Sequence, residues 1–111
     1  MDGMKRGDFV TIAMQGDFGK PRPALVIQSN QFDQLATVTV LPVTSTLLDA
    51  PLLRITVEPN SENGLQKPLQ VMVDKTMTVK CDKVGPAFGS IDADTMVVIE
   101  RSLAVFMGIA K

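Results

Sequence analysis

The pattern of apolar and polar positions along the chain changes once, close to residue 91. Before that point the apolar residues occur in short runs, many of them alternating with polar residues, and Gly and Pro separate the runs. Short alternating runs bounded by such turn residues are typical of β-strands. The strands predicted in this way cover residues 8–13, 23–29, 36–44, 53–58, 70–74 and 76–80.

Two prolines fall within these predicted strands and limit how the strands can pair. Proline has no amide hydrogen to donate to a neighbouring strand. We therefore expect Pro23 only at the start of its strand, and Pro42 at an edge or a bulge near the end of its strand.

From Ile91 onward the apolar period is that of a helix. Asp92 is a suitable N-cap for it. The apolar residues that follow form one stripe at helical spacing, which continues to Ile109: Met96, Ile99, Leu103, Phe106 and Met107. Many short strands followed by one helix predict a mainly β (β+α) fold, a small, strongly curved β-barrel with a C-terminal helix packed on it. Residues 1–111 are predicted to form a single domain.

The composition excludes several kinds of site. The chain has no His, which excludes Ser-His-Asp and Cys-His nucleophile sites, His-ligated zinc and a pair of His residues acting as ribonuclease acid and base. Cys81 is the only cysteine, so no intramolecular disulfide can form, and a reducing, cytoplasmic location is the default. The charged N-terminal residues are not followed by an apolar segment, so no signal peptide is expected, and no apolar run approaches the roughly 20 residues of a membrane span. No membrane partner is expected.

The net charge is close to zero, at −1. A dedicated nucleic-acid-binding protein is usually clearly basic, so this balance argues against broad electrostatic binding of RNA or DNA, although it leaves room for a local basic cleft. After Lys83 only Arg101 and Lys111 are basic, so the positive charge is concentrated earlier in the chain.

Arg22 is the first candidate for chemistry. It stands between Pro21 and Pro23, and each proline fixes its own φ and restricts the residue before it. The backbone of Arg22 should therefore be extended, with the direction of its side chain partly set. A guanidinium held in this way at the entrance of a buried strand can bind a phosphate through two hydrogen bonds. The alternative is an ordinary solvated arginine at the start of a strand.

Thr44 is the second candidate, at the hydroxyl-rich end of the strand predicted over 36–44. The hydroxyl groups of Thr44, Ser45 and Thr46 could donate to a phosphate oxygen. The alternative is that threonine and serine stand there because they suit strands and cap turns. Arg22 and Thr44 support each other only if their two strands adjoin, as a compact barrel would allow.

Two further places carry side chains suited to RNA. In the Gly-flanked loop before Arg22, Asp17 could orient a group or accept a proton, and Phe18 could stack on a base. A turn aspartate and an apolar residue folded onto the barrel are the alternatives there. Asp74 and Lys75 could line a groove beside Arg22, or form a solvated edge that discourages aggregation.

With these features the chain closely resembles the MazF/PemK-type toxins of bacterial toxin–antitoxin modules. The resemblance rests on KRGD at residues 5–8, GKPRPALVIQ at 19–28, LPVTS at 41–45 and the tail 84–109, which follow one another in the family's order. It implies an SH3-like barrel with a C-terminal helix, in agreement with the strand and helix pattern. It also implies a homodimer and a cognate antitoxin, similar to MazE or PemI, that occupies the RNA groove.

The activity implied by the resemblance is sequence-selective cleavage of single-stranded RNA, with no metal or other cofactor, which inhibits translation and growth. The ribose 2′-hydroxyl attacks its own phosphodiester and leaves a 2′,3′-cyclic phosphate. The family's catalytic arginine and threonine correspond to Arg22 and Thr44, and an acidic residue of the preceding loop corresponds to Asp17. The positions implied for RNA binding are Phe18, Lys20, Gln28, Ser45, Asp74 and Lys75.

Two other functions compete with this one. A CcdB-like toxin has a similar barrel, and it binds and poisons DNA gyrase through the end of its C-terminal helix without catalysis. Such proteins have a prominent Trp at the C-terminus, whereas this chain has no Trp and finishes with Gly, Ile, Ala and Lys at 108–111. A catalytically silent barrel would suit the near-neutral charge. The Arg-Pro and Pro-x-Thr segments favour the ribonuclease.

Overall fold

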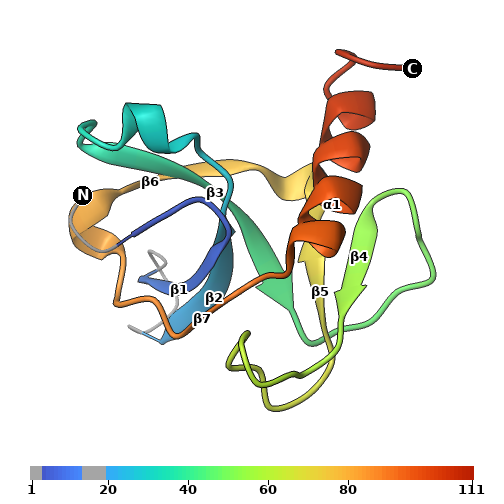
Figure 1. Ribbon diagram of the computed structural model, residues 1–111, viewed down its shortest axis with the longest axis horizontal. Helices are drawn as coiled ribbons and strands as arrows, with labels where there is room; N and C mark the ends of the chain where they lie inside the picture. The colour runs from blue at the N-terminus through green and yellow to red at the C-terminus, as the bar shows by residue number, and fades with distance from the viewer. Residues whose placement is uncertain (1–3, 14–19) are drawn as a thin grey trace.

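The computed structural model describes residues 4–13 and 20–111, and these form one antiparallel sheet with a helix at the C-terminus (Figure 1). The strands are β1 (Asp8–Ala13), β2 (Pro21–Val26), β3 (Thr37–Thr44), β4 (Arg54–Val57), β5 (Leu69–Met72), β6 (Met77–Lys80) and β7 (Gly89–Ser90). The helices are α1 (Ala93–Phe106) and three single 3₁₀ turns, η1 (Asn30–Phe32), η2 (Val73–Lys75) and η3 (Cys81–Lys83). The expected mainly β fold with a C-terminal helix is confirmed.

Strand β3 is the centre of the sheet. The strand order is β4-β5-β3-β2-β1-β7, and β6 also pairs with β3. Residues 37–40 of β3 pair with β6 and residues 43–44 pair with β5, so these two partners share the edge of β3 that lies opposite to β2. The sheet curls until Ile12 of β1 bridges to Val84, just after η3, which closes β1, β2, β3 and β6 into a small barrel (Figure 1).

Two apolar clusters lie on opposite faces of this sheet. The cluster beneath α1 consists of Phe9, Leu25, Leu41, Val43, Ile55, Val57, Val71, Val73 and Ile99. The cluster inside the barrel consists of Val10, Ile12, Ala24, Val26, Val38 and Val40. Because successive residues of a strand point to opposite faces, the alternation read from the sequence is what assigns each side chain to one cluster or the other.

The N-terminal segment is tied to the C-terminal helix. The guanidinium of Arg6 donates to the carbonyl oxygen of Ile27 and forms an ion pair with Glu100 of α1. Gly7 follows with a φ of 92°, and its amide donates to the carbonyl of Val26 at 2.8 Å. Glycine reaches this positive φ without steric cost, which accounts for a glycine directly before β1.

Helix α1 begins where the sequence predicts. The carboxylate of Asp92 caps it, accepting hydrogen bonds from the Thr95 amide and the Thr95 hydroxyl, both at 2.9 Å. Ile99 is fully buried against the sheet, and Met96 and Leu103 pack beside it. Among the described residues no helix is long and apolar enough to span a membrane.

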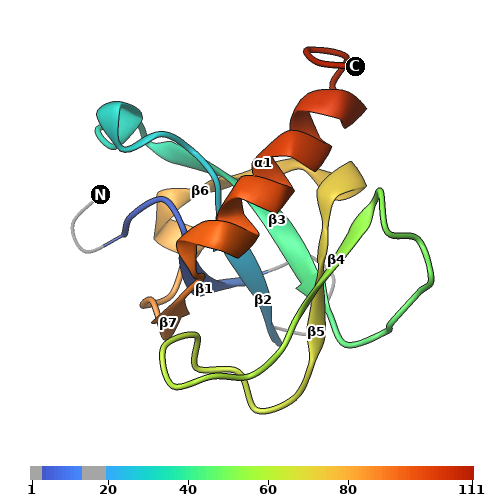
Figure 2. The same ribbon diagram turned by 45° about the vertical axis from the view of Figure 1, so that its right-hand side comes forward.

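The apolar stripe of α1 ends earlier than predicted. The helix ends at Phe106, before the predicted end of the stripe at Ile109, and Phe106, Met107 and Ile109 are 47%, 56% and 80% exposed. The reason is the length of the sheet: the last turns of α1 extend beyond the strands (Figure 2), and nothing in the described chain covers them there.

The prolines pair differently from the prediction. Pro21 and Pro23 both lie inside β2, paired with Ala13 and Thr11, so the expectation that Pro23 could only begin the strand was wrong. At this end β2 is paired with β1 alone, because the ladder to β3 begins at Ala24, and a strand with one unpaired side tolerates proline. Pro42, expected at an edge or a bulge, lies in the central strand β3, where it is paired with Ala24 of β2 and falls between the parts of β3 that pair with β6 and with β5.

Replacing Ile99 by alanine should reduce the free energy of unfolding by about 2–5 kcal/mol, because it opens a cavity between α1 and the sheet. Val98→Ala is a matched control, since the Val98 side chain is 48% exposed, and it should change stability by only about 0.5 kcal/mol. Urea unfolding followed by circular dichroism measures both. Equal losses in the two variants would contradict this packing of the helix.

Candidate active site

Arg22 and Thr44 lie at the same end of two neighbouring strands. The β2–β3 ladder pairs Ala24 with Pro42 and Val26 with Val40. The ladder ends at Ala24 and Pro42, and Arg22 and Thr44 each lie two residues farther along β2 and β3. Residues two apart in a strand point to the same face, and Ala24 and Pro42 are directly opposed, so Arg22 and Thr44 share that face. The condition that the sequence left open, that the two strands adjoin, is therefore fulfilled.

The same face carries a row of polar side chains across four strands. Thr44 is paired with Gln70 of β5, and Gln70 is paired with Thr56 of β4. Together with Arg22 these residues define what we call the polar face. It is the face turned away from α1, because the residues that alternate with them, such as Val43 and Val71, belong to the cluster beneath the helix.

The hydroxyl of Thr44 is oriented by the loop that follows it. Its oxygen accepts a hydrogen bond from the amide of Thr46 at 3.1 Å. This bond uses an acceptor site of the oxygen and leaves the hydroxyl proton available for donation to another group. Ser45 is exposed next to it. The end of β3 therefore presents the oriented hydroxyl of Thr44 and the exposed hydroxyl of Ser45.

Gln70 is the buried member of the polar face, and the sequence analysis did not identify it as part of the site. Its side chain is 4% exposed. Its carboxamide oxygen accepts from the Leu48 amide at 3.0 Å, and its nitrogen donates to the Leu48 carbonyl at 3.0 Å and to the Thr56 hydroxyl at 3.1 Å. The signal available in the sequence was one amide in an otherwise apolar strand.

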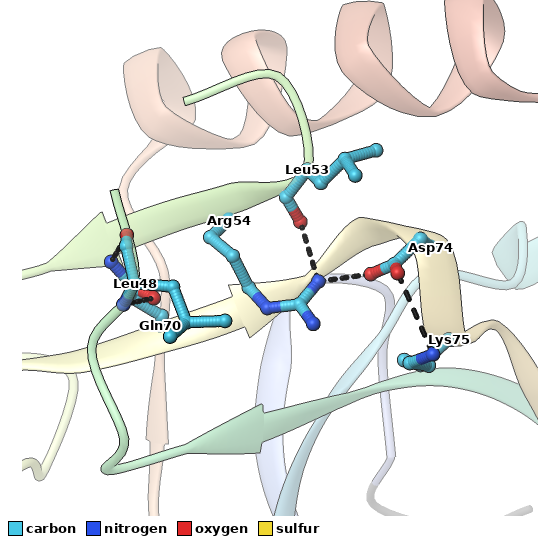
Figure 3. A network of polar contacts seen from close by, with 6 residues as sticks. All are labelled: Leu48, Leu53, Arg54, Gln70, Asp74 and Lys75. Carbon is cyan, nitrogen blue, oxygen red and sulfur yellow. Dashed lines mark hydrogen bonds and ion pairs between the residues drawn. The ribbon is translucent and has the colours of Figure 1, made fainter. Parts of the chain in front are cut away.

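Arg54, Asp74 and Lys75 form a charged network next to this row (Figure 3). The Arg54 side chain, 11% exposed, pairs with the Asp74 carboxylate and donates to the Leu53 carbonyl at 3.3 Å. The Lys75 ammonium lies 3.6 Å from the same carboxylate and is 58% exposed. Burial raises the pKa of Asp74, but the Arg54 hydrogen bond, the Asp74 backbone amide and the charges of Arg54 and Lys75 outweigh it, so that the pKa falls below 3.8.

This network changes the roles expected for two residues. Asp74 was expected to line a groove, but its carboxylate is mostly buried and paired with Arg54, which holds β4 to η2. Arg54, which sequence reasoning missed, is therefore a structural cation. Lys75 is the exposed charge of the three and the one that can reach an anion in solution.

The remaining predicted positions are not all brought together. Lys20 is exposed directly before β2, close in the chain to Arg22. Gln28 lies at the far end of that strand, about 20 Å along the chain from Arg22 at the usual strand rise. Its amide accepts from Thr39 and donates to Phe32, each at 3.0 Å, so it fastens η1 to β3 instead of joining Arg22. Asp17 and Phe18 lie outside the described residues.

This arrangement is suited to holding a phosphodiester. A guanidinium and a hydroxyl donor on one face can contact two oxygens of a single phosphate, and Lys20 and Lys75 add exposed positive charge. Within the described residues no three His, Cys, Asp or Glu side chains gather closely enough to hold a metal ion. Fold and site thus define a class, small curled β-barrels with a row of polar side chains on the face opposite a C-terminal helix.

Comparison with known proteins identifies the family within this class. The family described as "PemK-like, MazF-like toxin of type II toxin-antitoxin system" matches residues 5–107. The chain belongs to this family, which is the first of the two toxin classes considered from the sequence.

Individual relatives agree with that assignment. A protein of Mycolicibacterium smegmatis described as a probable endoribonuclease MazF is 45% identical over 108 residues, which cover 96% of this chain and 99% of that protein. The solved structure of an endoribonuclease in complex with its cognate antitoxin from Mycobacterial species has a TM-score of 0.81 at 23% identity, covering 97% of this chain and 98% of its own. A MazE-MazF structure from Deinococcus radiodurans has a TM-score of 0.78 at 21% identity, with coverage of 97% and 98%. These two structures support the fold.

Replacing Asp74 by asparagine should lower stability at neutral pH, because it leaves the Arg54 guanidinium without its counter-charge. The pKa of Asp74 is lowered by folding, so its contribution is complete above the unfolded-state pKa of about 4 and is lost as the pH falls through the folded-state pKa. The difference in thermal midpoint between wild type and Asp74→Asn should therefore be constant above about pH 5 and shrink below it. Asp82→Asn, at an exposed aspartate of η3, is the control; a gap that did not shrink as the pH was lowered through the acid range would contradict the ion pair.

Proposed function

We propose that this toxin is an endoribonuclease that cleaves single-stranded RNA at selected sequences and thereby inhibits translation and growth. The observation that supports the proposal most directly is the pairing of β2 with β3, which puts Arg22 and Thr44 on one face at the same end of two adjoining strands. Membership of a toxin family and 45% identity to a probable endoribonuclease MazF support it.

The proposed reaction is an internal transfer within the RNA. The ribose 2′-oxygen attacks the adjacent phosphorus, and the bond from phosphorus to the 5′-oxygen of the next nucleotide breaks. The products are a 2′,3′-cyclic phosphate and a 5′-hydroxyl, so one proton leaves the 2′-hydroxyl and one reaches the departing 5′-oxygen. No water is consumed, and no covalent intermediate with the enzyme forms.

Arg22 and Thr44 would stabilise the negative charge that develops on the phosphorane. The Arg22 guanidinium contacts the equatorial oxygens, and the Thr44 hydroxyl donates its proton to a non-bridging oxygen, a role compatible with its acceptance of the Thr46 amide. Arginine is a poor general base because its pKa exceeds about 12. We therefore assign the proton transfer from the 2′-hydroxyl to Asp17.

Exposed polar residues near Arg22 and Thr44 would bind the RNA on either side of the scissile phosphate. Lys20, Ser45 and Lys75 would contact the backbone, and Phe18 would stack on a base. Asp74 contributes by holding Lys75 in place. Because the net charge of the protein is −1, attraction of RNA depends on these local cations, and we do not assign Gln28 to this surface.

The partners proposed are a second copy of the chain and an antitoxin. The structurally similar endoribonuclease was solved in complex with its cognate antitoxin, and we propose that a MazE- or PemI-like antitoxin occupies the RNA groove of this protein as well. The location proposed is the cytoplasm, where the substrate is present and where a protein with a single cysteine meets reducing conditions.

Arg22→Ala should lower the cleavage rate about 10²–10³-fold, and Thr44→Val about 10²-fold, because each removes a donor to the developing charge. Both variants should unfold at the wild-type temperature, since Arg22 is exposed and Thr44 lies at a strand end. Cleavage of a long synthetic RNA in the presence of EDTA, with mapping of the cut sites, measures the rates and the sequence preference. Lys5→Ala, at an exposed cation before β1 and away from the polar face, is the control and should cut as wild type does.

Wild-type rates in a folded Arg22→Ala protein would refute the assignment of the site. No cleavage by the wild-type protein, together with inhibition of purified DNA gyrase, would favour the CcdB-like alternative. Loss of wild-type cleavage in EDTA would contradict a reaction without metal.

A homodimer should form through the exposed apolar end of α1 and the loop before β4. The exposed apolar side chains there are Leu47, Leu48, Leu52, Val105, Phe106, Met107 and Ile109, and a hollow of about 350 Å³ lies between the loop and the helix. Apolar surface of this extent is typical of protein interfaces.

Light scattering at micromolar concentration should give twice the monomer mass of 12.0 kDa. Phe106→Asp should reduce the dimer, because it places a charge in the apolar contact. Phe32→Asp is the matched control, since Phe32 is 50% and Phe106 is 47% exposed, and it should remain dimeric. A monomeric wild-type protein would contradict the homodimer, and an intact Phe106→Asp dimer would contradict this surface.

A further inference from the structure

We propose that Gln70 is a positioning residue for RNA cleavage, acting through the loop that orients the hydroxyl of Thr44. The inference rests on the proposed function of Arg22 and Thr44. In this proposal Gln70 does not contact the RNA that Arg22 and Thr44 bind. It determines where the segment between Thr44 and Leu48 lies.

The carboxamide of Gln70 holds the main chain of Leu48 on both of its polar groups. The Leu48 amide donates to the Gln70 oxygen and the Leu48 carbonyl accepts from the Gln70 nitrogen, both at 3.0 Å (Figure 3). Two hydrogen bonds of opposite direction restrain both the orientation of the Leu48 main chain and its distance from the Gln70 carboxamide. The main chain of Leu48, which lies in a loop, is thus fixed to β5 by a side chain of that strand.

Gln70 is itself fixed. It is paired with Thr44 on one side and with Thr56 on the other, in the ladders of β5 with β3 and β4. The second hydrogen of its amide group donates to the Thr56 hydroxyl at 3.1 Å. With a side chain only 4% exposed and all its polar atoms bonded, the carboxamide has one stable orientation, because any rotation would leave buried donors unpaired.

The loop between these anchors is short. It leaves β3 at Thr44 and is held again at Leu48, with Thr46 midway. The amide of Thr46 donates to the Thr44 hydroxyl oxygen at 3.1 Å. Fixing Leu48 therefore fixes the Thr46 amide, and the Thr46 amide sets the direction in which the Thr44 hydroxyl can donate its own proton.

Catalysis is sensitive to such positioning. A displacement of about 1 Å in a reacting or stabilising group can cost on the order of 100-fold in rate. Without the Gln70 amide the segment 45–49 is restrained only by its ends, and the Thr46 amide no longer holds one place. The expected loss is in kcat, since the Thr44 hydroxyl contributes mainly in the transition state.

The test is a double-mutant cycle between Gln70 and Thr44. Gln70→Met keeps the length and much of the volume of the side chain but removes every hydrogen bond to Leu48. We expect it to lower kcat about 10- to 100-fold on a short fluorescent RNA that spans one mapped cut site, with KM changed less than about threefold. In a Thr44→Ala background the same substitution should cost less than about twofold, because the group through which it acts is already gone.

Gln66→Met is the matched control. It makes the same substitution at an exposed glutamine outside the polar face, so its kcat should be that of the wild type. Single-turnover rates with excess enzyme keep the slow variants measurable, and thermal unfolding reports whether each is folded. If Gln70→Met does not fold, Gln70→Glu replaces it, since an ionised carboxylate accepts from the Leu48 amide but cannot donate to the Leu48 carbonyl.

Each outcome decides the matter. A wild-type kcat in the folded Gln70 variant overturns the inference, as does an equal loss in the wild-type and Thr44→Ala backgrounds, which would make Gln70 a general structural residue. Either result leaves the ribonuclease function intact, because that function is judged by cleavage in the wild type and by its loss in Arg22→Ala and in the Thr44 variants. Absence of RNA cleavage by the wild-type protein overturns both.

Discussion

Every peptide group of strand β3 needs a hydrogen-bonding partner, and the strand obtains them from three neighbours. Strand β2 lies along one edge, while β6 and β5 divide the other edge between them. The division falls at Leu41 and Pro42, where η2 connects β5 to β6 and where proline has no amide hydrogen that would need a partner. The curl of the barrel, the place of the helix and the geometry of the polar face all follow from this exchange of partners.

Much of this could be predicted from local pattern. Strand β1 and the Asp92 cap of α1 were predicted correctly, because alternation and capping depend on neighbours in sequence. The position of Pro23 inside β2 could not be predicted, because it depends on where the partner strand β3 begins to pair. The exposure of Phe106 could not be predicted either, because it depends on where the sheet stops beneath the helix. Arg22 and Thr44 were candidates from the sequence, but their adjacency is a property of the register.

The errors within the candidate site have the same origin. Gln28 belongs to the same short segment as Arg22, yet an extended chain carries it to the other end of the strand, where it holds Phe32 and Thr39. Gln70 and Arg54 gain their roles from contacts with residues about 20 positions away. Arg54 also neutralises Asp74, so that an overall acidic balance is compatible with Lys75 as a local exposed cation.

The contact between Arg6 and Glu100 joins the first described residues to the last helix, and Ile99 completes the cluster on which β1 to β5 pack. A nascent chain that has not yet released this helix from the ribosome lacks both. The cluster beneath α1 can therefore be complete only after residues 93–106 have left the ribosome.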